Sequence, residues 1–334
     1  MTAAPARPAV LVTRAVFPEV VARLRRHFDV EDNPTDAAYV AGELSRRLQG
    51  KAGAFTTGAD RIDAAVLDAN PQLRVVANMA VGYNNFDIPA CTARGVLATN
   101  TPDVLTETTA DFGFALMMAA ARRMVESEHS LRRGEWTRWS YDTYTGSDVH
   151  GATLGILGMG RIGQAIARRG ALGFGMKVIY HNRSRLAPEL EAPLGARYVD
   201  KATLLREADH LVLVLPYSAA SHHVMGASEF RQMKPSATLT NIARGGIVDD
   251  AALAVALRDR VIAAAALDVF EGEPSVHPAL LTLPNIVLTP HIASASVATR
   301  RAMADLAADN LIAALTGGVT PTPINPEALA GLPP

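Results

Sequence analysis

A short glycine-rich segment near the middle of the chain places the strongest constraint on its fold. The apolar run 153–157 leads into it and the amphipathic run 164–172 follows, so the glycines stand where a strand turns into a helix. Glycines at such a turn let the backbone approach a pyrophosphate, and the helix N-terminus supplies N–H donors and the positive end of its dipole. The segment therefore predicts a dinucleotide-binding site; it reads Gly158, Met159, Gly160, Arg161, Ile162 and Gly163.

The segment after the next predicted strand bears on which dinucleotide binds. An enzyme that uses NAD(H) places Asp or Glu there, to bind the ribose hydroxyls. Here strand 176–180 leads into a basic segment, and the first carboxylate is Glu189. Two guanidinium groups and a hydroxyl are the donors that a ribose 2′-phosphate requires. The sequence therefore predicts NADP(H) as the preferred cofactor and leaves NAD(H) open; the segment is His181, Asn182, Arg183, Ser184 and Arg185.

Length and composition are those of an ordinary globular protein with two domains. The chain has 334 residues, more than one core comfortably accommodates. Its formal net charge of -1 gives no field that favours nucleic acid or an anionic membrane, so we expect neither as a partner. Cys91 is the only cysteine, which excludes an internal disulfide and a cysteine-cluster zinc site. With no secretory signal and no apolar run long enough to span a bilayer, a cytoplasmic location is expected.

Short β-rich runs alternate with helix-length segments twice along the chain, which predicts two parallel α/β sheets. The first alternation begins at residue 10 and the second at residue 154. Between them, the Ala-, Leu- and Met-rich run 106–133 predicts a buried helix. A turn-rich loop follows, in which we expect packing or a subunit contact rather than catalysis; its aromatic residues are Trp136, Trp139, Tyr141 and Tyr144.

Three charged side chains stand just beyond the ends of apolar strands in the second alternation. They are Arg244, Glu273 and His291, and ligands of an open α/β sheet bind at this edge. Each alone would equally fit a turn, a solvated loop or a strand end, but their common location favours a catalytic site. An arginine can bind a substrate carboxylate and polarise its carbonyl, and an imidazolium beside a carboxylate can protonate the developing alkoxide. The trio therefore predicts reduction of a 2-oxo acid.

Five motifs in order make the chain resemble the D-isomer-specific 2-hydroxyacid dehydrogenases, over nearly all of residues 9–317. The resemblance is greatest to the branch of glyoxylate/hydroxypyruvate reductases and 2-ketogluconate reductases. Its departure from the NAD-using pattern is the missing acidic residue near His181. The motifs occupy residues 80–85 (AVGYNN), 157–163 (LGMGRIG), 241–245 (NIARG), 267–274 (LDVFEGEP) and 290–292 (PHI).

The resemblance implies two doubly wound parallel-sheet α/β domains. A Rossmann cofactor domain would be inserted into a flavodoxin-like substrate domain, with a cleft between them that closes on the substrate. Residues 1–101 and 293–334 would form the substrate domain, and residues 102–292 the NADP-binding domain. The resemblance also implies a homodimer joined through the cofactor domain, to which the aromatic loop would contribute.

The resemblance further implies where the ligands bind. The backbone amides of Val81 and Gly82 would hold the substrate carboxylate, with Arg244 and His291 completing the substrate site and Glu273 supporting His291. The nicotinamide side of the cofactor would be lined by Leu215, Pro216, Ile242, Ala243, Arg244 and Asp268. The implied reaction is hydride transfer from NADPH to glyoxylate, hydroxypyruvate or 2-ketogluconate, with His291 donating the proton, to give the D-2-hydroxy acid.

Other functions compete with this one. A D-lactate-type or other NAD-dependent 2-hydroxyacid dehydrogenase would share the catalytic motifs, and a dinucleotide-sensing, non-catalytic corepressor-like protein would share the fold. A metal-dependent hydrolase is a weaker rival, based on the adjacent pair His222 and His223. Because the sequence places no carboxylate motif near this pair, we expect two solvated loop histidines and no metal site.

Overall fold

The structure is a computed structural model that describes residues 7–40 and 42–331. The chain divides into two compact units, with boundaries between Leu105 and Thr106 and between Ala295 and Ser296. Unit 1 is made from both ends of the chain, and unit 2 is the continuous segment between them. The boundaries lie four and three residues beyond the expected domain ends at 101 and 292.

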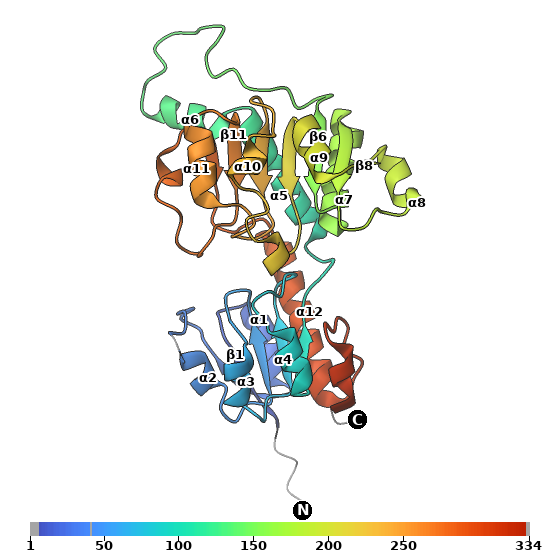
Figure 1. Cartoon of the computed structure of the whole chain (residues 1–334). Helices are drawn as coiled ribbons and strands as arrows, with labels where there is room; N and C mark the ends of the chain where they lie inside the picture. The colour runs from blue at the N-terminus through green and yellow to red at the C-terminus, as the bar shows by residue number, and fades with distance from the viewer. Residues whose placement is uncertain (1–6, 41, 332–334) are drawn as a thin grey trace, which may run out of the picture. The chain divides into compact units, whose positions relative to one another are not determined.

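Unit 1 is built on a parallel sheet. Its five strands in the described residues have the order β2-β1-β3-β4-β5, which is the flavodoxin-like order (Figure 1). Every residue of β3 and β4 is buried, because helices cover both faces of a doubly wound sheet. The strands are β1 (Ala9–Val12), β2 (Asp29–Asp32), β3 (Gly53–Thr56), β4 (Val75–Asn78) and β5 (Leu97–Thr99).

The C-terminal helix α12 (Val297–Thr316) completes unit 1. It packs against β3, β4 and β5 and against α1, so the two ends of the chain share one core. Its N-cap is Ser296, whose side chain accepts a hydrogen bond from the backbone N–H of Thr299. The other helices of this unit are α1 (Pro18–Arg25), α2 (Glu43–Arg47), α3 (Ala64–Asp68) and α4 (Ile88–Ala93).

Unit 2 is built on a second parallel sheet, with seven strands in the described residues in the order β12-β11-β10-β9-β6-β7-β8. The order reverses between β6 and β9, as in a Rossmann fold, and ligands of such sheets bind outside the carboxyl ends of the strands at this point. The strands are β6 (Thr153–Leu157), β7 (Lys177–His181), β8 (Arg197–Tyr198), β9 (His210–Leu213), β10 (Thr238–Asn241), β11 (Ala264–Leu267) and β12 (Ile286–Leu288).

Apolar side chains cover both faces of this second sheet. On β6, Leu154 and Ile156 pack into the buried cluster that includes α5 and α7, while Leu157 belongs to the cluster on the opposite face. Gly155 also faces the second cluster, where a Cβ would lie 2.7 Å from the Cβ of Ala208. A strand buried on both faces needs apolar residues at successive positions, which explains the continuous apolar run in the sequence.

The helix expected over residues 106–133 is divided in two. α5 (Thr106–Ala121) ends before Arg123, which has a φ of 51°, and α6 (Met124–Arg132) begins directly after it. The Arg123 guanidinium pairs with Glu126 at 2.8 Å (Nε to Oε2) and lies over the ring of Tyr144, 5.2 Å from its centroid. These contacts hold the left-handed residue that breaks the helix.

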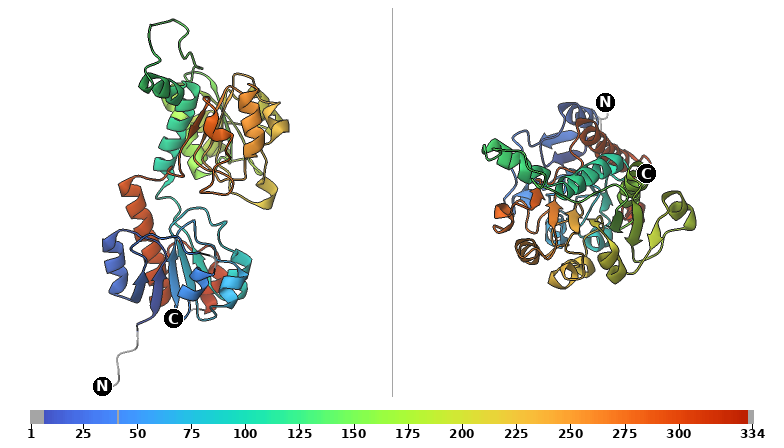
Figure 2. Two further views of the ribbon diagram at one scale, coloured as in Figure 1. Left: turned by 90° about the vertical axis from the view of Figure 1, so that its left-hand side faces the viewer. Right: turned by 90° about the horizontal axis from the view of Figure 1, so that it is seen from above.

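The helices of unit 2 lie on both faces of its sheet. α5 contacts β9 to β12 and α7, whereas α10 and α11 lie on the opposite face (Figures 1 and 2). Besides α5 and α6, the helices are α7 (Arg161–Arg168), α8 (Pro188–Glu191), α9 (Lys201–Glu207), α10 (Ala227–Phe230) and α11 (Asp250–Arg258). No helix in the part of the chain that the structure describes is both long and apolar enough to cross a membrane.

Candidate active site

The glycine-rich segment forms the turn between β6 and α7. Gly158 has a φ of 103°, and a Cβ there would lie 2.7 Å from the backbone N of Leu215. A Cβ on Gly163 would lie 2.4 Å from the carbonyl oxygen of Gly158, so a larger residue would push α7 away from β6. Only glycine therefore permits this approach at either position.

The same turn leaves room for a ligand at the start of α7. A Cβ on Gly160 would meet nothing within 4 Å. Gly160 is the N-cap of α7 and supplies no side-chain cap, and Arg161 and Ile162 are the first two helical residues. Open space beside an uncapped helix N-terminus fits a pyrophosphate, because the first N–H groups of a helix lack partners within the helix.

Two residues of the basic segment support the glycine turn. The Asn182 side-chain oxygen accepts a hydrogen bond from the backbone N–H of Met159, at 2.6 Å. His181 Nδ1 lies 2.8 Å from the carbonyl oxygen of Val199, and its ring stacks on that of Tyr198 with centroids 5.8 Å apart. The Asn182 side chain thus fixes the end of β7 against the turn, and the His181 side chain fixes it against the end of β8.

Arg185 is paired within the protein. Its Nη2 lies 2.6 Å from Oε2 of Glu191, and its Nε lies 2.9 Å from Oε1. The buried hydroxyl of Tyr180 donates to the same carboxylate at 2.5 Å. Arg185, and to a smaller extent Tyr180, hold the pKa of the Glu191 carboxyl below its ordinary value. Among the described residues, Arg183 and Ser184 have no comparable partner, and both are exposed.

Glu273 and His291 form a hydrogen-bonded pair at the carboxyl edge of the second sheet. Glu273 follows β11, His291 follows β12, and His291 Nδ1 lies 2.7 Å from Glu273 Oε2. Burial alone would raise the pKa of the Glu273 carboxyl, but the hydrogen bond and charge from His291 hold that pKa below its ordinary value. An ionised carboxylate only accepts hydrogen bonds, so Nδ1 carries the hydrogen and Nε2 is the nitrogen left for another partner.

Arg244 lies at the same edge, after β10, in a turn that presses against the loop leading to Glu273. A Cβ on Gly245 would lie 1.7 Å from the carbonyl oxygen of Phe270, so only glycine permits this approach. Asn241 holds the turn by accepting from the backbone N–H of Ala243 at 3.0 Å and donating to the Arg244 carbonyl oxygen at 3.2 Å. Burial lowers the pKa of the Arg244 guanidinium, and the charge of Glu273 opposes that change. An arginine stays charged in such surroundings.

The remaining predicted cofactor residues also follow strands of this sheet. Leu215 and Pro216 come after β9, and Ile242 and Ala243 come after β10. Ile242 and Ala243 are each only 6% exposed, so their side chains belong to the core. Their positions bring them to the edge that also carries Arg244, Glu273 and His291.

The two substrate residues predicted in unit 1, Val81 and Gly82, lie in a loop after β4. Asn100 donates to the carbonyl oxygen of Val81 at 2.8 Å, and Asn78 donates to that of Gly82 at 3.1 Å. Among the described residues, no hydrogen bond uses the N–H groups of Val81 and Gly82. The loop is therefore held through its carbonyl groups, and its amides remain available as donors.

The chain matches known proteins over nearly its whole length. Residues 114–293 fit the family model described as D-isomer specific 2-hydroxyacid dehydrogenase, NAD binding domain. The chain is 46% identical to a glyoxylate reductase of Thermococcus kodakarensis, over 97% of this chain and 98% of that protein. It belongs to the D-isomer-specific 2-hydroxyacid dehydrogenases.

Other dehydrogenases of this family are similarly close. A glyoxylate reductase of Aeropyrum pernix is 48% identical, over 97% of each chain. Among solved structures, the NADPH-dependent glyoxylate/hydroxypyruvate reductase of Sinorhizobium meliloti, in complex with NADP and malonate, is 38% identical with a TM-score of 0.84. That alignment covers 97% of this chain and 98% of the other. The family resemblance inferred from the five motifs is thereby confirmed.

One functional role in this dehydrogenase was not anticipated from its sequence. Asp268 is fully buried, and its Oδ1 accepts from the Thr289 hydroxyl at 2.7 Å and the Ile292 N–H at 2.8 Å, while Oδ2 accepts from the Ala293 N–H at 2.8 Å. These bonds hold the turn in which His291 has a φ of 54°. Asp268 thus positions the backbone that carries the imidazole. The only sequence signal for this role was an acidic residue directly after the apolar run 263–267.

Proposed function

We propose that this dehydrogenase reduces glyoxylate, and also hydroxypyruvate and 2-ketogluconate, to the D-2-hydroxy acid with NADPH. The observation that carries the proposal is the ionised Glu273 bonded to His291, beside Arg244, at the ligand-binding edge of a Rossmann sheet. Relatives named glyoxylate reductase favour this substrate class. So does the relative named an NADPH-dependent glyoxylate/hydroxypyruvate reductase.

Each of the three side chains has one task in this reaction. Arg244 binds the substrate carboxylate and carbonyl oxygen through paired N–H donors, which polarises the carbonyl. His291 donates its Nε2 proton to the carbonyl oxygen as that oxygen gains negative charge, which completes the hydroxyl of the product. Glu273 keeps the Nδ1 hydrogen in place and orients the ring. When bound, the nicotinamide supplies the hydride to the carbonyl carbon.

The free amides in unit 1 suit the carboxylate of the substrate. We assign the N–H groups of Val81 and Gly82 to the substrate carboxylate, because two adjacent backbone donors can bind its two oxygens. Asn78 and Asn100 position these donors through the loop carbonyls. This assignment rests on the family resemblance and on the free state of both amides among the described residues.

The preference for NADPH is assigned to Arg183 and Ser184. Both are exposed directly after β7, and the segment contains no carboxylate that would repel a 2′-phosphate. Arg185 has a structural role instead, because its guanidinium is already paired with Glu191, which also accepts from the Tyr180 hydroxyl. Leu215, Pro216, Ile242, Ala243 and Asp268 remain the proposed lining of the nicotinamide side.

Steady-state kinetics test substrate and cofactor together. We expect the highest kcat/KM with one of glyoxylate, hydroxypyruvate and 2-ketogluconate, a lower value with pyruvate, and NADPH preferred over NADH. The variant Arg183→Ala should lower kcat/KM for NADPH by roughly 10- to 100-fold with little effect on NADH, because a charged hydrogen bond to phosphate is lost. Arg185→Ala is the matched control and should lower the melting temperature while leaving the cofactor ratio nearly unchanged.

The same measurements distinguish the alternatives. Equal kcat/KM with NADH and NADPH in the parent enzyme would contradict the assignment of Arg183 and identify an NAD-dependent member of the family. Preference for pyruvate would favour a lactate-type enzyme. Dinucleotide binding without turnover of any of these acids would indicate a non-catalytic sensor.

We also propose that the protein forms a homodimer through unit 2. The loop after α6 exposes three aromatic side chains, at 58% for Trp136, 79% for Trp139 and 84% for Tyr141. Nearby in the same unit, a cavity of about 370 Å³ is lined by residues of α5, α6 and the region around β12, including Ala120, Glu126 and Ile286. Exposed aromatic rings and an adjacent cavity suit a self-complementary contact between two copies.

A further inference from the structure

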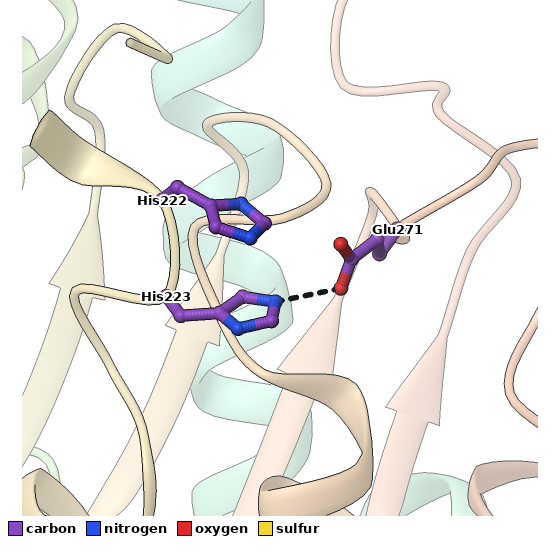
Figure 3. Close-up of side chains that lie close together, drawn as sticks. All are labelled: His222, His223 and Glu271. Atoms are coloured by element: carbon purple, nitrogen blue, oxygen red, sulfur yellow. Dashed lines mark hydrogen bonds and ion pairs between the residues drawn. The ribbon is translucent and has the colours of Figure 1, made fainter. Parts of the chain in front are cut away.

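Two histidines and a glutamate from distant parts of the chain meet on the surface of unit 2 (Figure 3). His222 and His223 lie in the loop after β9, directly after the short helical turn Ala219–Ser221 in the sequence. Glu271 follows β11. One ligand atom from each side chain lies within 4.8 Å of the other two. In the part of the chain that the structure describes, no other group of three His, Cys, Asp or Glu side chains has this geometry. The fold thus supplies the carboxylate that the sequence does not place near the histidine pair.

Hydrogen bonds and stacking orient the three side chains. His223 Nε2 lies 2.7 Å from Glu271 Oε2, and the two imidazole rings stack with centroids 3.8 Å apart and planes tilted by 22°. The Tyr217 hydroxyl lies 3.2 Å from His222 Nδ1, which leaves His222 Nε2 for another partner. A hydrogen bond to the second ring nitrogen is typical of metal-ligating histidines, because it fixes the tautomer and the ring orientation.

The backbone beneath the cluster is also fixed. His223 has a φ of 50°, and its N–H donates to the carbonyl oxygen of Gly246 at 2.7 Å. Gly246 itself has a φ of 76°, and a Cβ there would lie 3.3 Å from His222 Nδ1. The N–H of Glu271 donates to Asp250 at 3.1 Å. The two loops that carry His223 and Glu271 are therefore held by contacts within the protein.

We propose that His222, His223 and Glu271 bind a divalent transition-metal ion, for which Zn²⁺ is the best match. Two imidazole nitrogens and one carboxylate oxygen form the ligand set of an open tetrahedral zinc site, with water in the fourth position. Ligand bonds near 2.1 Å place the donors about 3.4 Å apart, so the two imidazole rings must rotate out of their stacked arrangement to bind one ion. Their exposure allows it, since the side chains of His223 and Glu271 are 36% and 45% exposed.

The bound ion would link two loops at the edge that carries the active site. One loop follows β9 and contains Leu215 and Pro216, and the other follows β11 and contains Glu273, two residues beyond Glu271. An ion that binds the folded chain and not the unfolded one raises the apparent stability with its concentration. Zn²⁺ should therefore raise the melting temperature even in the absence of substrate and dinucleotide.

Calorimetric titration of the untagged, chelator-treated protein with ZnCl₂ tests this site. We expect one Zn²⁺ per chain, a higher melting temperature, and intense visible absorption bands of tetrahedral Co²⁺ when CoCl₂ replaces ZnCl₂. His222→Gln and Glu271→Gln should each weaken binding by at least about tenfold and remove the thermal shift. His129→Gln is the matched control: this histidine is exposed and lies 3.9 Å from Glu128, but the pair has no third ligand, so binding should be unchanged.

A second control separates this site from the active site. His291→Asn should retain Zn²⁺ affinity, because the Glu273–His291 pair also lacks a third ligand in the described residues. Zn²⁺ binding that is lost in His291→Asn but kept in His222→Gln would overturn the proposal, as would equal affinity of the parent and both cluster variants. Because His222 is exposed and its backbone is not in the left-handed region, His222→Gln remains informative even if variants of His223 fail to fold.

The pH dependence gives an independent readout. A histidine binds a metal ion through a neutral ring nitrogen, so Zn²⁺ competes with protons for His222 and His223. Affinity should therefore be weaker in acidic than in neutral buffer. A Zn²⁺ affinity that is the same in both buffers would show that the histidines are not ligands.

Discussion

The carboxylate of Glu273 and the imidazole of His291 are each restrained on the side away from the proposed substrate position. Glu273 Oε1 accepts from the backbone N–H of Phe270 at 2.8 Å, and Oε2 holds His291 Nδ1. Asp268 in turn fixes the backbone on either side of the imidazole. Catalysis by proton donation needs such restraint, because a ring that rotates spends little time in the productive geometry.

Replacement of His291 isolates its chemical contribution. His291→Asn should lower kcat by about 10²- to 10⁴-fold, the usual contribution of a general acid, and leave the dissociation constant for NADPH nearly unchanged. Stopped-flow or steady-state kinetics measure kcat, and fluorescence titration measures the dissociation constant for NADPH. His129→Gln, on the surface of α6, is the control and should behave like the parent. A kcat within a few-fold of the parent value would exclude His291 as the proton donor.

For single residues, the sequence predicted which side chains lie at the candidate site better than it predicted which side chains contact each other. Arg244, Glu273 and His291 could be selected because each follows an apolar strand, and parallel strands end at one edge. The ion pair between Arg185 and Glu191 could not be predicted, because it depends on where the short helix α8 packs after β7. The same limit applied to the histidine pair, whose carboxylate lies 48 residues further along the chain.

Among the elements, the segment from β7 to α8 depends on one buried polar cluster. The Tyr180 hydroxyl accepts from the Leu186 N–H at 2.8 Å and donates to Glu191, to which Arg185 is paired. Tyr180 and Glu191 are 0% and 5% exposed. A buried polar group that loses its partner costs stability, so all three side chains are needed together.

The charge of Glu191 makes the stability of this segment depend on pH. Because the folded chain lowers the pKa of Glu191, its contribution is complete above the ordinary value, about 4.3, and is lost as the pH falls through the folded-state pKa. Glu191→Gln should therefore lower the melting temperature most at neutral pH, and the difference should shrink below about pH 4. Differential scanning calorimetry from pH 7 to pH 3 measures this difference in melting temperature. Glu189→Gln, exposed on the same helix, should have no effect; a pH-independent difference for Glu191→Gln would contradict the ionic role.

Two of the strands that escaped prediction have little apolar sequence. β2 and β8 lie at the edges of their sheets and carry Asp, Glu and Arg, because an edge strand is partly solvated. The break at Arg123 also gave no signal, since neither Gly nor Pro marks it. The central strands were predictable because burial on both faces demands continuous apolar runs.

At the scale of the whole molecule, the proposed dimer depends on the aromatic loop. Replacing Trp139 and Tyr141 by Ser should shift the protein toward a monomer, because large exposed aromatic rings are the side chains most enriched at subunit contacts. Light scattering coupled to size-exclusion chromatography measures the mass. Leu172→Ser, at a 69% exposed position elsewhere in unit 2, is the control. A parent protein that is already monomeric, or a double variant of unchanged mass, would contradict the assignment.

Because unit 1 is made from two separate segments of the chain, its sheet must wait during synthesis for the helix that covers it. Its sheet is made first, but α12, which packs so closely on β3 that a Cβ on Gly53 would lie 2.8 Å from Leu311, is made only after unit 2. Unit 2 separates the two, and at about 5–20 residues per second its translation takes on the order of 10–40 s. During this interval the nascent chain exposes the apolar face that α12 later covers, so it is a natural client for chaperones until α12 has been made.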